Sequence, residues 1–534
     1  TYPDEIALNE VRNKSGDLAQ IEVAMRGRIV RARMWRADIG RVPLYLLDTN
    51  VPENDDADRF ITGHLYGGDR ETRMVQEMML GIGGVRLLRL LGIQPSVFHL
   101  NEGHSAFLTL ELAREIIANE QVDFQTAAPR VRKRCVFTTH TPVAAGHDEF
   151  EGALVQKGFG DWPETNLGLS REEFLGLGRV NGDSSEGFGL TPLALRLCRS
   201  TNGVSRKHGE VSRALWRKLW PEKDVAEVPI TSVTNGVHPA TWVAPPVRAL
   251  FEKYLGEVWP DETYRVDDWF EAISKIPDEE LWQTHCALKR RLVAFVRQHL
   301  TQTARAGVES EDRSALTTLD SEALTIGFAR RVAGYKRWDL LLSDRERLMR
   351  LINDPARPVQ FVFAGKAHPH DQGAKLVLQN LVQWLREPSV HERVAFIEDY
   401  DQEVARQLVQ SVDVWMNVPR RPQEASGTSG QKAAVNGGLN FSVLDGWWLE
   451  GYDGANGFAI GDLSEAGNND EADRQDAESL YRTLEEEIVP RFYDRDQNRV
   501  PRQWVAMMKR AIQTLVPAFS SDRMVAEYAE RIYR

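Results

Sequence analysis

The segment from Glu424 to Gly437, EASGTSGQKAAVNG, constrains this chain more than any other feature. It follows an apolar run, Val412 to Val418, that is typical of a buried strand, and it places a carboxylate, a Ser-Gly-Thr-Ser-Gly turn and a lysine within nine residues. A turn of this kind at the start of a helix binds anions through converging backbone N–H groups and the helix dipole. We therefore predict that a phosphate-bearing cofactor lies between the turn and Lys432, about one helical turn into the next helix. The alternative is a flexible loop with a solvated lysine.

A second segment, GFARRVAGYKRWDLL, begins like a strand and ends like a helix. It gathers four cations around one turn, namely Arg330, Arg331, Lys336 and Arg337. Like charges held this close repel one another unless an anion neutralises them, so the segment predicts a phosphate site. The alternative is a solvated, basic start of a helix.

Short apolar runs that end in polar residues recur along both halves of the chain. They predict buried strands at 96–102, 135–142, 324–329, 359–365, 394–399 and 412–419, with helix-length segments between them. This alternation predicts an α/β fold with parallel sheets, whose ligands bind at the carboxyl ends of the strands. We place a hinge near 242–246, a charged helix from Pro277 to Leu300, and a solvated loop at 461–476.

Composition narrows the class of function. The 534 residues suffice for two or three domains, and the formal net charge of −12 argues against nucleic-acid or anionic-membrane partners. Three widely spaced cysteines indicate reduced thiols in the cytoplasm rather than disulfides or a zinc site. The apolar runs are shorter than a membrane span. The motif HLNEGHSAF offers three metal ligands, His99, Glu102 and His104, but without a second cluster we expect no metal site.

Many separate motifs, in one order along the whole chain, resemble the α-glucan (glycogen, maltodextrin or starch) phosphorylases, and the match is nearest to their short bacterial form. The resemblance implies a GT-B glycosyltransferase-like fold, with two Rossmann-like domains facing a cleft. It places an N-terminal domain at 1–242, a C-terminal domain at 243–515 and a helix at 516–534 that crosses back to the first domain.

The resemblance also implies a reaction: phosphorolysis of an α-1,4-glucan to α-glucose 1-phosphate with retention, using pyridoxal 5'-phosphate attached to Lys432. Its matching positions are catalytic Lys432, Arg331 and Lys336; cofactor-binding Lys432, Arg330, Tyr335, Thr428 and Ser429; and substrate-binding His140, Asn235, Glu424, Ser426 and Gly427. On residues alone, a lone histidine such as His140 is more often structural, and Asn235 in its Asn-Gly turn is a common hairpin or loop signal. The implied partners are glucan and inorganic phosphate, in a cytoplasmic enzyme that forms a homodimer or higher homo-oligomer.

Several departures from the family pattern bear on activity. Gln431 stands where relatives usually have methionine, and Arg330 where many have lysine. Relatives also carry an N-terminal glycine-rich turn that we do not find, so we expect a fragment or natural truncation that is a poor enzyme. Two other functions stay open, a non-catalytic glucan-binding remnant and a nucleotide-sugar glycosyltransferase of the same fold.

Overall fold

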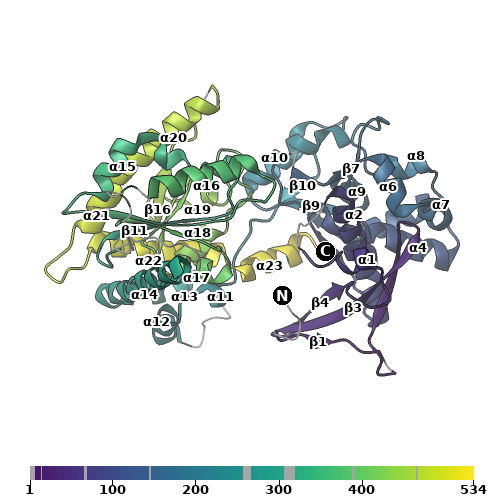
Figure 1. The fold of residues 1–534 in the computed structure, drawn as a ribbon, viewed down its shortest axis with the longest axis horizontal. Coiled ribbons are helices and arrows are strands. Elements are labelled where there is room, and N and C mark those ends of the chain that lie inside the picture. Colours follow the sequence, from purple (N-terminus) through teal and green to yellow (C-terminus); the bar gives the residue numbers. More distant parts are fainter. Residues whose placement is uncertain are drawn as a thin grey trace. The chain divides into compact units, whose positions relative to one another are not determined.

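The computed structural model describes residues 6–13, 15–64, 69–143, 146–256, 266–305, 319–385, 387, 390, 392–464 and 467–534. The chain divides into two compact units (Figure 1). The first consists of residues 1–204, 209–232 and 531–534, and the second of residues 205–208 and 233–530. Each unit has its own sheets and its own hydrophobic core, and each is described here by itself.

The first unit begins with an antiparallel sheet that the sequence patterns did not predict. Its strands are β1 (Asn9–Glu10), β2 (Gln20–Met25), β3 (Arg28–Ile39) and β4 (Val42–Asp48). β3 pairs with the other three strands. Side chains of β2 alternate between buried and more exposed positions, so one face packs on the core while the other faces water. The expectation of α/β structure from the start of the chain is therefore wrong for this segment.

The parallel sheet of the first unit has the order β10-β9-β6-β5. Its strands are β5 (Phe98–Asn101), β6 (Cys135–Thr138), β9 (Ser200–Gly203) and β10 (Ile230–Ser232). The two predicted strands at 96–102 and 135–142 are confirmed as β5 and β6, which pair in parallel. The short antiparallel pair β7 (Glu149–Phe150) and β8 (Phe188–Gly189) lies apart from this sheet.

Helices of the first unit fill the connections between these strands. They are α1 (Asp56–Arg59), α2 (Arg70–Met78), α3 (Gly84–Leu90), α4 (Leu108–Glu120), α5 (Phe124–Arg134), α6 (Gly152–Phe159), α7 (Trp162–Leu167), α8 (Arg171–Gly176), α9 (Leu190–Leu197) and α10 (Arg206–Trp216). A π-helical turn, Met79–Gly83, joins α2 to α3, and several of its residues are buried.

The second unit is built on six parallel strands in the order β13-β12-β11-β14-β15-β16. They are β11 (Leu324–Ala329), β12 (Val359–Ala364), β13 (Val394–Ile397), β14 (Val414–Asn417), β15 (Leu439–Val443) and β16 (Gly457–Ile460). The four predicted strands of this half are confirmed as β11 to β14. Every side chain of β11, β12, β14 and β15 is buried, as expected for parallel strands that are covered on both faces.

Helices cover both faces of this sheet (Figure 1). They are α11 (Pro239–Trp242), α12 (Pro245–Leu255), α13 (Val266–Ser274), α14 (Asp278–Arg305), α15 (Arg345–Ile352), α16 (Gln372–Leu385), α17 (Gln402–Ser411), α18 (Ser429–Ala434), α19 (Trp448–Gly451), α20 (Asn469–Thr483), α21 (Val489–Tyr493), α22 (Arg502–Ala518) and α23 (Ser521–Arg531). The helix predicted from Pro277 is confirmed as α14. The loop predicted at 461–476 is partly wrong, because α20 begins inside it with Asn468 as its N-cap.

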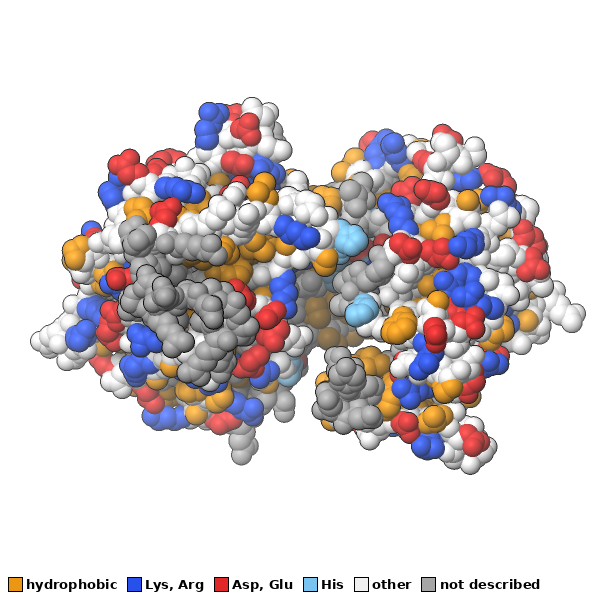
Figure 2. All heavy atoms as spheres, in the orientation of Figure 1, with side chains coloured by type: hydrophobic (Ala, Val, Ile, Leu, Met, Phe, Trp, Pro, Cys, Tyr) orange, Lys and Arg blue, Asp and Glu red, His pale blue; other side chains and the backbone are white. Residues whose placement is uncertain are grey.

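On the face shown in Figure 2, acidic and basic side chains are interspersed over each unit. Among the described helices, none combines the length and the apolar character that a bilayer crossing requires.

A buried ion cluster ties α14 to the sheet of the second unit. Asp413, which is fully buried, accepts hydrogen bonds from Lys289 Nζ at 2.9 Å, His285 Nε2 at 2.8 Å and the Thr325 backbone N–H at 2.7 Å. These partners hold the pKa of Asp413 below its usual value, although burial works in the opposite direction. The cluster fixes the start of β11 next to α14.

We predict that Asp413→Ala lowers the free energy of unfolding by about 3–5 kcal/mol, because it leaves the buried Lys289 ammonium without its counter-ion. Chemical denaturation followed by circular dichroism measures the change. The control is Glu346→Ala, which removes an exposed partner of Arg350 and is expected to cost less than about 1 kcal/mol. Similar losses for the two variants would contradict a stabilising role for the cluster.

Candidate functional site

Loops at the carboxyl ends of β11 and β14 carry most of the predicted site residues. Arg330 follows β11 directly, and a short 3-10 turn, Gly334–Lys336, comes next. The Glu424 loop follows β14 and leads into α18. Because β11 and β14 are neighbours in the sheet, these two loops meet at the same edge.

One carboxylate lies between two of the predicted phosphate-site cations. Glu424 Oε2 accepts a hydrogen bond from Lys336 Nζ and lies 3.8 Å from Arg330 Nη1. All three side chains are largely buried. Burial, followed by the nearby charge of Arg330, lowers the pKa of Lys336 to about 8. The Nε and Nη1 atoms of Arg330 are buried and have no hydrogen-bond partner among the described residues, so the cation retains donors for a further anion.

Arg337 does not belong to this cluster, which corrects the grouping of four cations. Its guanidinium donates to the backbone oxygens of Val418 and Pro419, both at 2.9 Å, and to Asp473 at 2.9 Å and Asp476 at 2.7 Å. The side chain is almost fully buried. It therefore ties the end of β14 to α20, and two carboxylates already neutralise it.

Arg331 and Tyr335 flank the cluster in different ways. Arg331 is exposed, so its guanidinium is accessible to solvent. The ring of Tyr335 lies 4.5 Å from Lys336 Nζ, and burial together with the Glu424 charge raises the pKa of the Tyr335 hydroxyl to about 12. The Tyr335 backbone oxygen accepts from the Arg420 N–H at 2.7 Å, which joins the two loops.

Lys432 is the fourth residue of α18, as the sequence predicted. Its ammonium lies 3.8 Å from the centre of the Trp242 ring, and burial lowers its pKa. Among the described residues, no carboxylate forms an ion pair with it. A lysine in this state loses its proton more readily and becomes a better nucleophile toward a carbonyl carbon. The sequence analysis missed Trp242, although the tryptophan that closes TNGVHPATW was a signal for it.

The turn before α18 differs from a simple anion-binding helix start, because α18 has only six residues. Thr428 is its N-cap without a side-chain cap, and its carbonyl accepts from the Lys432 N–H at 3.3 Å. Ser429 Oγ accepts from Trp415 Nε1 at 2.9 Å. The short helix contributes little dipole, so side-chain cations rather than α18 supply most of the positive charge here.

Glu424 is held in place by a buried acid that the sequence analysis also missed. Asp445 accepts from the backbone N–H of Glu424 at 2.9 Å and of Gly446 at 2.8 Å. Burial nevertheless raises its pKa to about 7. Beside Glu424, the Ser426 hydroxyl is buried without a hydrogen-bond partner among the described residues, and Gly427 adopts a left-handed backbone with φ of 81°.

Asn235 lies in the second unit, in the segment that precedes α11. Its backbone oxygen accepts from Gln431 Nε2 on α18 at 3.0 Å. Its neighbour Thr234 is held by the Glu450 carboxylate, at 2.9 and 3.0 Å, and by Arg523. The structure therefore brings the predicted sugar contact Asn235 next to the lysine helix.

His140 lies in the first unit, just beyond the carboxyl end of β6. Its backbone N–H donates to Glu102 Oε2 at 2.7 Å, and its Nε2 lies 2.6 Å from Asn101 Oδ1. Thr141 Oγ1 also donates to Glu102, at 3.0 Å. Burial lowers the pKa of His140, which favours the neutral imidazole that a sugar hydroxyl can bind. The Glu102 carboxylate thus holds this loop in place through two hydrogen bonds.

A different trio in the first unit has the donor types of a metal centre. Ligand atoms of Glu77, His104 and Asp148 lie within 4.8 Å of one another. Arg73 lies among them, with its Nη2 2.8 Å from His104 Nδ1, 3.2 Å from Glu77 and 3.1 Å from Asp148. A guanidinium at this position already neutralises the carboxylates, and it opposes binding of a second cation.

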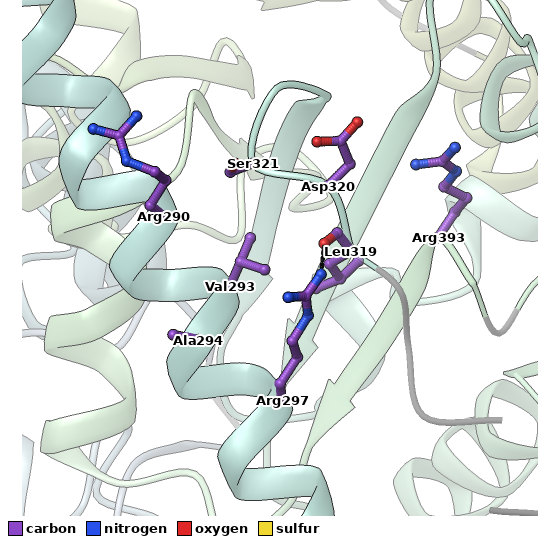
Figure 3. Close-up of a pocket in the computed structure, with 8 residues that line it drawn as sticks. All are labelled: Arg290, Val293, Ala294, Arg297, Leu319, Asp320, Ser321 and Arg393. Atoms are coloured by element: carbon purple, nitrogen blue, oxygen red, sulfur yellow. Dashed lines mark hydrogen bonds between the residues drawn. The ribbon is translucent and has the colours of Figure 1, made fainter. Parts of the chain in front are cut away.

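A basic pocket of about 560 Å³ lies at the other edge of the second unit's sheet (Figure 3). Arg290 and Arg297 of α14 line it together with Arg393, which precedes β13, and Asp320, which precedes β11. These positions mark the amino ends of the strands. The Lys336 and Glu424 loops follow the carboxyl ends, so this pocket is separate from the candidate site.

Comparison with known proteins identifies the family. The model of the carbohydrate phosphorylase family matches residues 179–486, which is more than half of the chain. The chain is 43% identical to maltodextrin phosphorylase of Thermococcus litoralis and 42% identical to glycogen phosphorylase of Mycobacterium tuberculosis, in each case over 99% of this chain and 62% of the relative. It is 41% identical to glycogen phosphorylase of Aquifex aeolicus over 98% of this chain and 75% of that protein.

This chain belongs to the carbohydrate phosphorylase family. It spans about 62% of the length of the first two relatives.

Arg331 and Arg337, two arginines of the same basic segment, provide a matched pair of variants. We predict that Arg337→Ala lowers the free energy of unfolding by about 3–5 kcal/mol, because two carboxylates and two carbonyls lose a buried partner. Arg331→Ala, at an exposed position, is expected to change it by less than about 0.5 kcal/mol. Thermal and urea unfolding of both variants test this, and equal effects would show that Arg337 is no more structural than Arg331.

Proposed function

We propose that this chain forms the catalytic part of an α-1,4-glucan phosphorylase, which transfers the terminal glucosyl residue of a glucan to inorganic phosphate and releases α-glucose 1-phosphate. The observation that carries the proposal is the pairing, within one unit, of a lysine with lowered pKa and a buried cation cluster with unused donors. Family membership and the names of the relatives support the same reaction.

The residues fit pyridoxal 5'-phosphate. Lys432 has the lowered pKa of an amine that attacks an aldehyde, and the Trp242 ring beside it offers a flat apolar surface for an aromatic cofactor. Thr428 and Ser429 precede Lys432, and Tyr335 and Arg330 lie on the neighbouring loop. When bound in this family, the cofactor supplies a phosphate group that exchanges a proton with the substrate phosphate.

The cations would hold the substrate phosphate. Arg330 and Lys336 are fixed around Glu424, and Arg331 is accessible from solvent. Preorganised cations in a water-poor site stabilise developing negative charge at little reorganisation cost. Their role is to bring phosphate groups close together and to offset the repulsion between them.

The polar groups beside the cations would orient the terminal sugar. Glu424 and Ser426, with the backbone of Gly427, would bind its hydroxyls from one loop, and Asn235 from another. His140 of the first unit would complete the sugar subsite. This assignment implies the GT-B arrangement, with two Rossmann-like domains facing a cleft. We also propose a cytoplasmic, homo-oligomeric enzyme.

We predict that borohydride reduction in the presence of pyridoxal 5'-phosphate labels Lys432. Peptide mapping by mass spectrometry identifies the labelled residue. Lys366 serves as an internal control, because it is exposed and lies 3.5 Å from Asp399. Labelling at Lys336 or Lys366 would overturn the assignment. Lack of any visible cofactor absorbance would favour the nucleotide-sugar glycosyltransferase instead.

We further predict that phosphorolysis weakens as the pH rises through about 8. Lys336 is cationic below its pKa of about 8 and neutral above it, so the KM for phosphate should rise on the alkaline side. The initial rate of glucose 1-phosphate release, measured at pH 6.5 to 9.5, tests this. Lys336→Ala is expected to lower kcat/KM about 10²-fold or more.

Two variants, Lys336→Arg and Arg331→Ala, distinguish the loss of the Lys336 charge from other causes of the pH dependence. Lys336→Arg keeps a cation that does not lose its proton in this range, so the alkaline rise in the phosphate KM should disappear. Arg331→Ala is expected to lower kcat/KM about 10²-fold but to keep the alkaline rise. If Lys336→Arg kept the wild-type pH profile, another group would be the one that titrates.

A further inference from the structure

Gln431, beside Lys432, forms a hydrogen bond that an apolar side chain at this position would lack. Its side chain is 2% exposed, and its Nε2 donates to the Asn235 backbone oxygen at 3.0 Å. Its Oε1 is buried and accepts no hydrogen bond from the described residues. A methionine of similar length would fill the space but would leave the Asn235 carbonyl without this donor.

The side-chain amide of Asn436, which follows Lys432 in the chain, also holds this segment. Asn436 Oδ1 accepts from the Ala244 N–H at 2.7 Å, and its Nδ2 donates to the Trp242 oxygen and to the Lys432 oxygen, both at 3.0 Å. Gln431 and Asn436 therefore clamp the two ends of the segment 235–244 onto the lysine helix. The Trp242 ring on the Lys432 ammonium lies between the two clamps.

The lysine helix packs closely against its neighbours. A Cβ at Gly430 would collide with Asn440 Oδ1 and approach Trp447 Cζ2 to 2.9 Å, so α18 lies closely against β15 and the tryptophan. Position 431 follows directly, which leaves its side chain little freedom. The hydrogen bond from the Gln431 amide thus holds the Asn235 turn at a defined position relative to α18.

Other contacts hold the neighbours of Asn235 rather than Asn235 itself. Thr234 is bound by Glu450 and Arg523, the Gly236 N–H points to Met524 Sδ at 3.4 Å, and Val237 pairs with Ser520. Within the described structure, the hydrogen bond from Gln431 is the one made to the Asn235 carbonyl. Together with the Gly236 N–H, which belongs to the same peptide group and points to Met524 Sδ, it holds the plane of the peptide from which the Asn235 side chain starts.

We propose that Gln431 is a positioning residue that sets the sugar-binding direction of Asn235 through its amide bond to the Asn235 carbonyl. The inference rests on the proposed function, in which Asn235 contacts the glucosyl hydroxyls. Gln431 touches neither sugar nor phosphate in this role. Its loss should weaken glucan binding and leave the cofactor and phosphate sites intact.

The test is Gln431→Met in the full natural protein. We expect the KM for maltoheptaose to rise about three- to tenfold, the size of one lost neutral hydrogen bond, with little change in kcat or in the KM for phosphate. Cofactor absorbance should be unchanged. Calorimetric titration of maltoheptaose in the absence of phosphate should show the same loss of affinity. Gln431→Glu, whose carboxylate cannot donate, is a second variant expected to shift the KM in the same direction.

A double-mutant cycle distinguishes positioning from a general packing effect. Adding Gln431→Met to Asn235→Ala should cause no further rise in the glucan KM, since residues that act through one contact are not additive. Gln407→Met is the matched control, because it removes a buried amide whose bond goes to Glu403 in its own helix. It should leave the glucan KM unchanged.

Two results would overturn the inference while leaving the proposed function intact. One is an unchanged glucan KM in a Gln431→Met enzyme that still performs phosphorolysis. The other is full additivity with Asn235→Ala. A wild-type protein that binds maltoheptaose but releases no glucose 1-phosphate would instead contradict the proposed function, and the calorimetric comparison would still test Gln431.

Discussion

The Glu424 carboxylate, buried between Lys336 and Arg330, is the interaction on which the candidate site depends. Two cations this close, both largely out of water, require a negative partner. Asp445 fixes the Glu424 backbone from behind, and the carboxyl ends of β11 and β14 bring the two loops together. The fold therefore holds two cations in place around one carboxylate, which leaves them only partly neutralised before any further anion binds.

Sequence patterns predicted four of the six described strands of the second unit's sheet, β11 to β14, because these strands are covered on both faces and read as continuous apolar runs. They did not predict β15 and β16. The antiparallel sheet β1–β4 was not predicted. Its strands mix arginine with apolar residues, because one face of the sheet is exposed. The helix α20 was missed for a related reason. Its first turns are acidic and polar, and its stability comes partly from Arg337, a contact that joins residues far apart in the chain.

At the site, the residue types were predictable but their partners were not. Charge and spacing placed Lys336 and Arg337 in one group, yet one bonds Glu424 and the other two aspartates of α20. Which acid each cation meets depends on strand order and on side-chain direction, and neither is local in sequence. Trp242 and Asn436 were missed for the same reason, because their contacts with Lys432 appear only once the chain has folded.

Arg330 and Gln431 both contribute hydrogen-bond donors to this unit. Arg330 carries a planar fork that has five donors, and part of that fork is left unused by the described protein. Gln431 carries an amide that reaches the Asn235 carbonyl. Donors of this kind add directional bonding that a point charge or an apolar side chain of similar volume cannot provide. The Asn235 segment is thereby tied to the short helix α18 by a directional hydrogen bond as well as by packing.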